Sequence, residues 1–126
     1  MVTADLRRYA AQARSTETFG RVMSSCREHH FVVDGPVWNG CPGEAVTPGE
    51  LFLAAVASCG VELLHVIARE RDVGLRRVGV AVQGTIDRSR PVREDLALFN
   101  SVRLDMELEG VGEQEAGQLV EAFKGR

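Results

Sequence analysis

The chain has few cysteines, no excess of basic residues, and no internal repeat or low-complexity tract. Its 126 residues include only three cysteines, which argues against a disulfide-stapled secreted scaffold and favours a reducing, cytoplasmic location. Fifteen Lys and Arg residues stand against eighteen Asp and Glu residues, giving a formal charge of −3. No global positive field is therefore available to hold a nucleic-acid backbone. A single globular domain is expected.

Targeting and membrane-spanning segments are also lacking in the sequence pattern. Residues 1–13 have no apolar h-region of the kind that signal peptides carry. The most apolar stretch, residues 51–67, is interrupted by Glu62 and His65, and the run before them is short for a bilayer. This stretch is predicted to be a buried helix, and no membrane partner is expected.

The familiar catalytic and metal-binding motifs are missing too. There is no Gly-rich phosphate loop and no Gly-x-Ser-x-Gly elbow. The cysteines and histidines do not have the spacing of a zinc site, and His29 and His30 would point to opposite faces of a strand. We therefore expect no metal and no cofactor.

The apolar periodicity predicts an α+β domain with the order βββ–α–ββ–α. Residues 1–36 are interpreted as a β-meander that ends at the turn Asp34-Gly35-Pro36. A loop over residues 37–46 follows. The pattern then predicts a central helix over 47–73, alternating strands within 77–110 and an amphipathic helix over 112–125.

The central helix has the clearest start signal in the chain. Thr47 is the expected N-cap, Pro48 the first helical residue and Glu50 the third, which is the capping-box pattern. Gly74 is a plausible C′ residue. Because the helix is apolar on all sides, it is predicted to be buried on all sides. Two small sheets cannot easily cover it, so the surplus apolar area suggests a second copy of the chain.

Cys59, within this helix, has two interpretations. It is either a small buried hydrophobe, as free cysteines often are, or a reactive thiol. Glu62, one turn later, disfavours a thiolate unless it is paired, so an activating cation must come from elsewhere in the fold or from a partner chain. Glu50 likewise is either only a cap, which its local pattern favours, or a carboxylate that orients a catalytic arginine.

The helix sequence resembles the central-helix motif of the OsmC/Ohr family of osmotically inducible and organic-hydroperoxide-resistance proteins. That motif has a Pro, an acidic residue, a Leu, a run of small apolar residues and a Cys. Similar segments follow in order over nearly the whole chain. The matching segments are residues 47–59, 76–84, 99–102 and 121–126.

The resemblance implies an intertwined homodimer with two active sites at the subunit interface. Peroxidase members reduce organic hydroperoxides with a thiolate, without metal or flavin, and an external dithiol or low-molecular-weight thiol restores them. The peroxidatic cysteine corresponds to Cys59. The activating arginine, held by a glutamate at the helix start, is assigned to Arg21, with Arg27 and Arg14 as further candidates, and the glutamate to Glu50.

Three departures from the family pattern stand out. The glutamate of the organic-hydroperoxide members lies ten residues before the cysteine, where this chain has Gly49, and one residue turns a helical side chain by about 100°. The family's resolving cysteine follows the last helix, where this sequence ends at Arg126. Cys26 and Cys41 are not family catalytic positions, although Cys41 could approach Cys59 and act as a resolving thiol.

Three functions are therefore compatible with the sequence. The first is thiol-dependent reduction of organic, lipid-type hydroperoxides to alcohols. The second is a non-catalytic dimer that binds a small apolar or oxidised ligand in an interface pocket. The third is another reaction of the Cys59 thiol, such as sulfur transfer.

Overall fold

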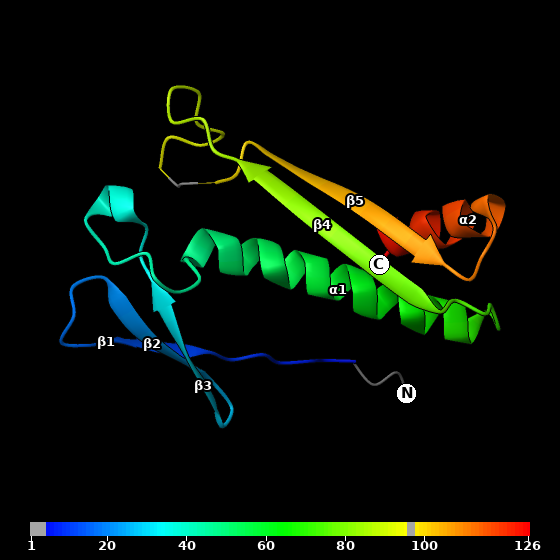
Figure 1. Cartoon of the computed structure of the whole chain (residues 1–126), viewed down its shortest axis with the longest axis horizontal. Coiled ribbons are helices and arrows are strands. Elements are labelled where there is room, and N and C mark those ends of the chain that lie inside the picture. Colours follow the sequence, from blue (N-terminus) through cyan, green and yellow to red (C-terminus); the bar gives the residue numbers. More distant parts are fainter. Residues whose placement is uncertain (1–4, 96–97) are drawn as a thin grey trace. The chain divides into compact units, whose positions relative to one another are not determined.

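The computed structural model describes residues 5–95 and 98–126, and Figure 1 follows the chain through them. By their internal contacts, residues Met1–Leu51 and Phe52–Arg126 form two compact units, each treated by itself below. The element order matches the predicted βββ–α–ββ–α order. Residues 1–4 of the predicted meander lie outside the described residues.

The first unit contains a three-stranded antiparallel sheet of β1 (Gln12–Ser15), β2 (Arg21–Cys26) and β3 (His29–Asp34), in that spatial order. The register places Arg21 opposite Asp34 on the neighbouring strand. A short 3-10 turn over Val37–Asn39 lies in the predicted loop that leads to the long helix. The three strands of this sheet follow one another in sequence order and lie between Gln12 and Asp34.

The long helix α1 spans Pro48–Glu70 and begins as predicted. The Thr47 backbone N–H donates to Glu50 Oε1 at 3.1 Å, and the Glu50 N–H donates to Thr47 Oγ1 at 3.4 Å. Both halves of the capping box are therefore present.

The end of α1 differs from the prediction. Asp72, with φ of 54°, takes the left-handed conformation that was assigned to Gly74. The Val73 N–H donates to the Ala68 carbonyl at 2.8 Å, which is the 6→1 bond of a Schellman motif. Aspartate is among the few side chains that tolerate this conformation, so the left-handed residue lies two positions before Gly74 and the helix ends at Glu70.

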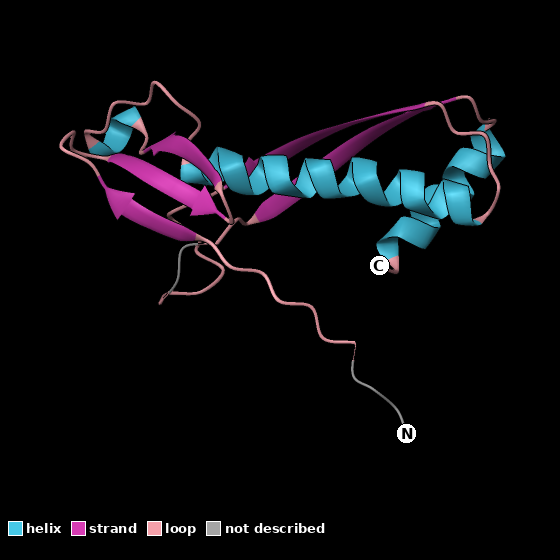
Figure 2. Ribbon diagram, turned by 90° about the horizontal axis from the view of Figure 1, so that it is seen from below, coloured by secondary structure: helices cyan, strands magenta, loops and turns pink. Residues whose placement is uncertain are grey.

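The second unit packs α1 against a two-stranded antiparallel sheet, β4 (Arg77–Thr85) and β5 (Ser101–Glu109), and against helix α2 (Glu113–Lys124). Both strands run along α1 in Figures 1 and 2. Inner and outer residues alternate along β4 and through most of β5, as the sequence pattern predicted. The fully packed core lies around the later part of α1. Its buried members are Leu64, Ile67, Ala68 and Leu119.

Burial on all sides of α1 is not found in the chain. Its buried residues are Gly60, Leu64, Ile67 and Ala68, whereas Phe52 is 54% exposed. Among the described residues α1 alone has the length and apolar composition of a membrane span, with a mean hydropathy of 2.0, a property that core helices of soluble proteins share. The prediction was wrong for one chain because its small sheet covers only one side of the helix.

Two glycines in this unit provide a matched test of its packing. A Cβ on Gly84 of β4 would lie 2.7 Å from two ring carbons of Phe99 and 3.0 Å from Leu53 Cδ2, so Gly84→Ala should destabilise by about 1–3 kcal/mol. A Cβ on Gly60 would meet Val80 at an ordinary 3.4 Å, so Gly60→Ala should stabilise by about 0.5–1 kcal/mol through helix propensity. Chemical denaturation of both variants measures this difference, and equal effects would contradict the packing described.

Candidate functional site

Cys59 lies on the side of α1 that the second unit leaves open. Its neighbour Gly60 is buried against Val80 and Met106. A Cβ placed on Gly60 would lie 3.4 Å from the nearest side-chain atom of Val80 and 3.7 Å from that of Met106. Because successive helical residues are about 100° apart, the Cys59 side chain is turned away from that contact. Its thiol is free and exposed. The interpretation of Cys59 as a buried hydrophobe therefore does not hold for the single chain.

Apolar side chains flank the thiol along the same stripe of the helix. Phe52 lies seven residues before Cys59, which is close to two full turns or about 10 Å along the axis, with the exposed Ala55 between them. The Phe52 ring stacks on Phe99 with centroids 5.6 Å apart and an interplanar angle of 20°. This stack, which the sequence analysis did not find, depends on Gly84 leaving room for Phe99.

Arg21, in the first unit, is held by two carboxylates. Its Nε and Nη2 donate to the two Asp34 oxygens, each at 2.8 Å, and Nη2 also donates to Glu44 Oε1 at 3.1 Å. The Asp34 side chain is completely buried, whereas that of Glu44 is 76% exposed. The hydrogen bond that Arg21 donates to Asp34, followed by the one that it donates to Glu44, raises the pKa of the Arg21 guanidinium above its already high ordinary value.

Asp34 accepts two further hydrogen bonds, from the backbone N–H groups of Glu44 and Ala45, both at 3.0 Å. With the Arg21 fork, this satisfies a buried carboxylate with four donors. The Arg21 hydrogen bond is the largest influence and outweighs burial, so the pKa of Asp34 falls to about 2. The ion pair therefore ties the loop after β3 to the sheet.

The sequence pattern indicates only a turn at Asp34 and gives no role to Glu44. One feature of the sequence does indicate a partner for Asp34: it directly follows the apolar run Phe31-Val32-Val33. A buried charge without a partner at such a position would destabilise the fold.

Cys41 fills the space beside this ion pair. A Cβ on either Gly20 or Gly35 would overlap the Cys41 side chain, and these glycines directly precede Arg21 and follow Asp34 in the sequence. The Gly35 N–H donates to the Gly20 carbonyl at 2.8 Å, which holds the two backbones together beneath the sulfur. Cys41 thus has a packing role in the first unit, and its resolving role stays a prediction.

Glu50 is engaged at the helix start. Besides the backbone bond, its Oε1 accepts the Thr47 hydroxyl at 2.8 Å. The backbone hydrogen bond from Thr47, then its hydroxyl, lowers the pKa of Glu50. Among the described residues, the carboxylates that pair with Arg21 are Asp34 and Glu44, not Glu50. The roles of Cys59, Arg21 and Glu50 in catalysis stay predictions.

The two carboxylates on Arg21 allow a direct comparison of buried and exposed ion pairs. Asp34→Asn should lower the midpoint of thermal unfolding by about 10 °C, because it breaks a buried pair, and Glu44→Gln by less than about 3 °C. Because the pKa of Asp34 is lowered on folding from 3.8 to about 2, its ionised form stabilises the protein above about pH 4. This stabilisation is lost as the pH falls to about 2.

Calorimetry at pH 2, 4 and 7 measures both effects. The wild-type midpoint should fall more steeply between pH 4 and 2 than that of Asp34→Asn. Unfolding midpoints of the wild type and Asp34→Asn that fall in parallel with pH would contradict a stabilising role of the buried Arg21–Asp34 pair. Equal decreases of the midpoint in Asp34→Asn and Glu44→Gln would contradict it too.

The comparisons with known proteins bear on the whole fold. An OsmC-like protein of Mycoplasma pneumoniae superposes with a TM-score of 0.80 at 15% identity, covering 95% of this chain and 82% of that one. An organic hydroperoxide resistance protein of Elizabethkingia anophelis superposes with a TM-score of 0.74 at 20% identity, covering 96% of this chain and 84% of that one. An organic hydroperoxide resistance protein of Legionella pneumophila superposes with a TM-score of 0.70 at 22% identity, covering 95% of this chain and 84% of that one.

No match was found among proteins of curated function. The family model for OsmC-like proteins matches residues 41–125, which include all of α1, β4, β5 and α2. The predicted α+β architecture and the resemblance to the OsmC/Ohr family are therefore both confirmed, and this chain belongs to the OsmC-like protein family.

Proposed function

We propose that this protein reduces organic hydroperoxides with Cys59 as the attacking thiolate. The observation that carries the proposal is the exposed Cys59 thiol, which lies on the open, apolar side of α1. Two of the similar structures are organic hydroperoxide resistance proteins, which supports the same class of substrate here. Identity to them is 22% and 20%, which shows a shared fold, and the activity is our proposal.

The proposed step is a two-electron displacement at oxygen. The Cys59 thiolate attacks the terminal oxygen of ROOH, an S–O bond forms and the O–O bond breaks. The departing alkoxide takes up a proton and leaves as the alcohol ROH, while the sulfur is oxidised to a sulfenic acid. An external dithiol, or two molecules of a low-molecular-weight thiol, then reduces the sulfenic acid to the thiol with release of water and is itself oxidised to a disulfide. We place this cycle in the cytoplasm.

The surroundings of the thiol favour an organic substrate over hydrogen peroxide. Phe52 and Ala55 offer apolar surface along the same stripe, so the carbon chain of ROOH can lose contact with water as it binds. Hydrogen peroxide has no such group and gains nothing from this surface.

The proposed working form is a homodimer. The side of α1 that one chain leaves open includes Leu51 at 36% and Phe52 at 54% exposure, which are large apolar groups for a surface helix. A second copy that covers this side would exclude water around Cys59 and could supply an activating cation. Arg21, the first candidate for that cation, already carries two carboxylates, so Arg14 and Arg27 must be compared with it directly.

The pairing of Arg21 also favours a second candidate function. The positive charge of Arg21 is neutralised by Asp34 and Glu44, so this side chain stabilises the first unit and is not free to activate the Cys59 thiol. Such a role is expected in a non-catalytic dimer that binds a small apolar or oxidised ligand. In that case Cys59 would lack the cation that a peroxidatic thiolate needs.

Stopped-flow oxidation of the reduced protein separates the two functions. With cumene hydroperoxide the wild-type protein should react at least about 100-fold faster than free cysteine, and Cys59→Ser should abolish the fast phase. Hydrogen peroxide should react more slowly. Cys26→Ser and Cys41→Ser are the matched controls and should keep the fast first oxidation. A wild-type rate no greater than that of free cysteine would reject the peroxidase and favour the binding dimer.

A further inference from the structure

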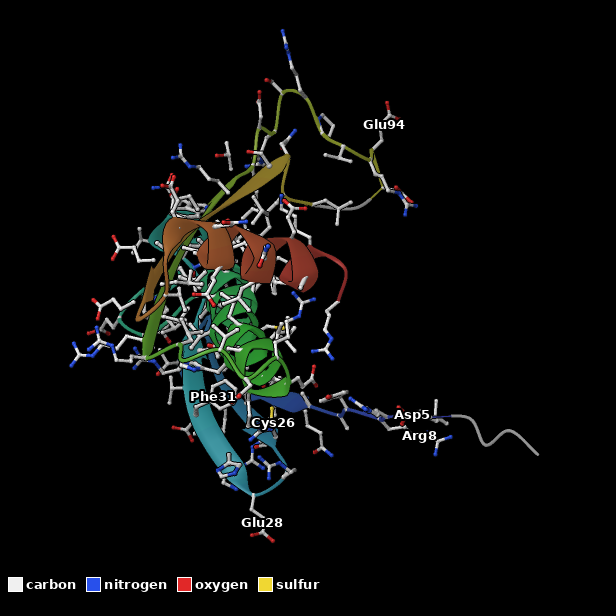
Figure 3. The ribbon with its side chains drawn as sticks, turned by 90° about the vertical axis from the view of Figure 1, so that its right-hand side faces the viewer. Asp5, Arg8, Cys26, Glu28, Phe31 and Glu94 are labelled. Carbon is white, nitrogen blue, oxygen red and sulfur yellow. The ribbon has the colours of Figure 1, made fainter. Side chains whose placement is uncertain are left out.

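The first unit has a basic hollow, and two of its residues, Arg14 and Arg27, are also the further candidates for the cation that activates Cys59. Its volume is about 590 Å³, and three arginines, Arg8, Arg14 and Arg27, line it together with His30. Arg8 lies on the segment that leads into β1, as Figure 3 shows. We call these four residues with Ser25 and Met23 the basic hollow.

The strand register explains why these side chains meet. Arg14 on β1 lies opposite Met23 on β2, and Ser25, two residues further along β2, lies opposite His30 on β3. Alternate residues of a strand share a face, so all four belong to one face of the sheet. The distance of 2.7 Å between Ser25 Oγ and His30 Nδ1 fixes the imidazole orientation. When Ser25 donates this bond, His30 Nε2 carries the ring hydrogen and is a donor.

No carboxylate lines the hollow in the described part of the chain. Nearby acidic groups are engaged or directed elsewhere: Asp5 pairs with Arg7, and Figure 3 shows Glu28 pointing outward from the tip of the β2–β3 hairpin. Over residues 5–95 and 98–126, none of the three arginines of the hollow forms an ion pair. Three like charges therefore share one surface hollow in a protein whose net charge is −3.

Arg27 gives a second, independent observation. It has φ of 54° in the β2–β3 turn, a left-handed conformation that usually belongs to Gly, Asn or Asp. A bulky residue kept in an unfavourable backbone conformation is a reason to look for a function of its side chain. Here that side chain lines the hollow.

We propose that the basic hollow binds a small organic anion that carries phosphate groups, of the size of a nucleoside diphosphate. Guanidinium forks match phosphate oxygens in charge and geometry, and three of them suit more than one negative charge. Met23 and the alanines beside Arg14 supply apolar contact for the organic part. The volume lies within the usual range for small-molecule sites. This inference goes beyond the proposed function, because it does not involve Cys59.

Isothermal titration of the full-length protein at low ionic strength tests the proposal. The probes are ADP, inorganic pyrophosphate and uncharged adenosine. We expect ADP and pyrophosphate to bind with Kd below about 1 mM, adenosine not to bind, and added salt to weaken both anions. Tighter binding of ADP than of pyrophosphate would support recognition of the organic part. Binding of adenosine as tight as that of ADP, or no binding of either anion, would overturn the proposal.

Two variants and one control place the binding in the hollow. Arg14→Gln should weaken ADP binding about tenfold, whereas Arg88→Gln, an exposed arginine in the loop after β4, should leave it unchanged. Arg27→Gly should weaken binding by at least about fivefold while raising the midpoint of thermal unfolding, because it relieves the left-handed backbone at this turn. Unchanged affinity in both Arg14→Gln and Arg27→Gly, or an equal loss in Arg88→Gln, would overturn the proposal.

Discussion

The packing of Gly60 against Val80 and Met106 determines which side of α1 remains open. Gly60 is buried on the side of α1 that faces the β4–β5 sheet, and the helical rotation directs the preceding side chain, Cys59, away from that sheet. The core proper forms further along, around Leu64 and Ile67, so the earlier part of α1 keeps Leu51 and Phe52 exposed. The accessible thiol, the apolar stripe and the expectation of a second copy all follow from this one-sided packing.

The first unit depends in the same way on one buried carboxylate. Asp34 accepts hydrogen bonds from Arg21 of β2 and from two backbone N–H groups of the loop after β3. These bonds hold the loop against the sheet. The glycines beside the ion pair leave room for Cys41 over their backbones. This arrangement makes Arg21 a stabilising element of the first unit, and it directs the search for an activating cation toward other arginines or a partner chain.

The element order, the capping box of Thr47 and Glu50, and the alternating strands were predictable because each is set by local pattern. The end of α1 was not, because the competition between Asp72 and Gly74 for the left-handed position depends on where Val73 packs. Partners distant in sequence were also missed. The pairing of Arg21 with Asp34 and the Phe52–Phe99 stack follow from tertiary packing, which a single sequence does not specify.

Cys59 is proposed to be the residue that takes an oxygen atom from an organic hydroperoxide. Peptide mapping by mass spectrometry, after reduced protein receives one equivalent of cumene hydroperoxide and a sulfenic-acid trap, tests it most directly. We expect one trapped adduct, on Cys59, with Cys26 and Cys41 unmodified and a stoichiometric yield of the alcohol. A trap distributed over all three cysteines, or found on Cys41 alone, would contradict it.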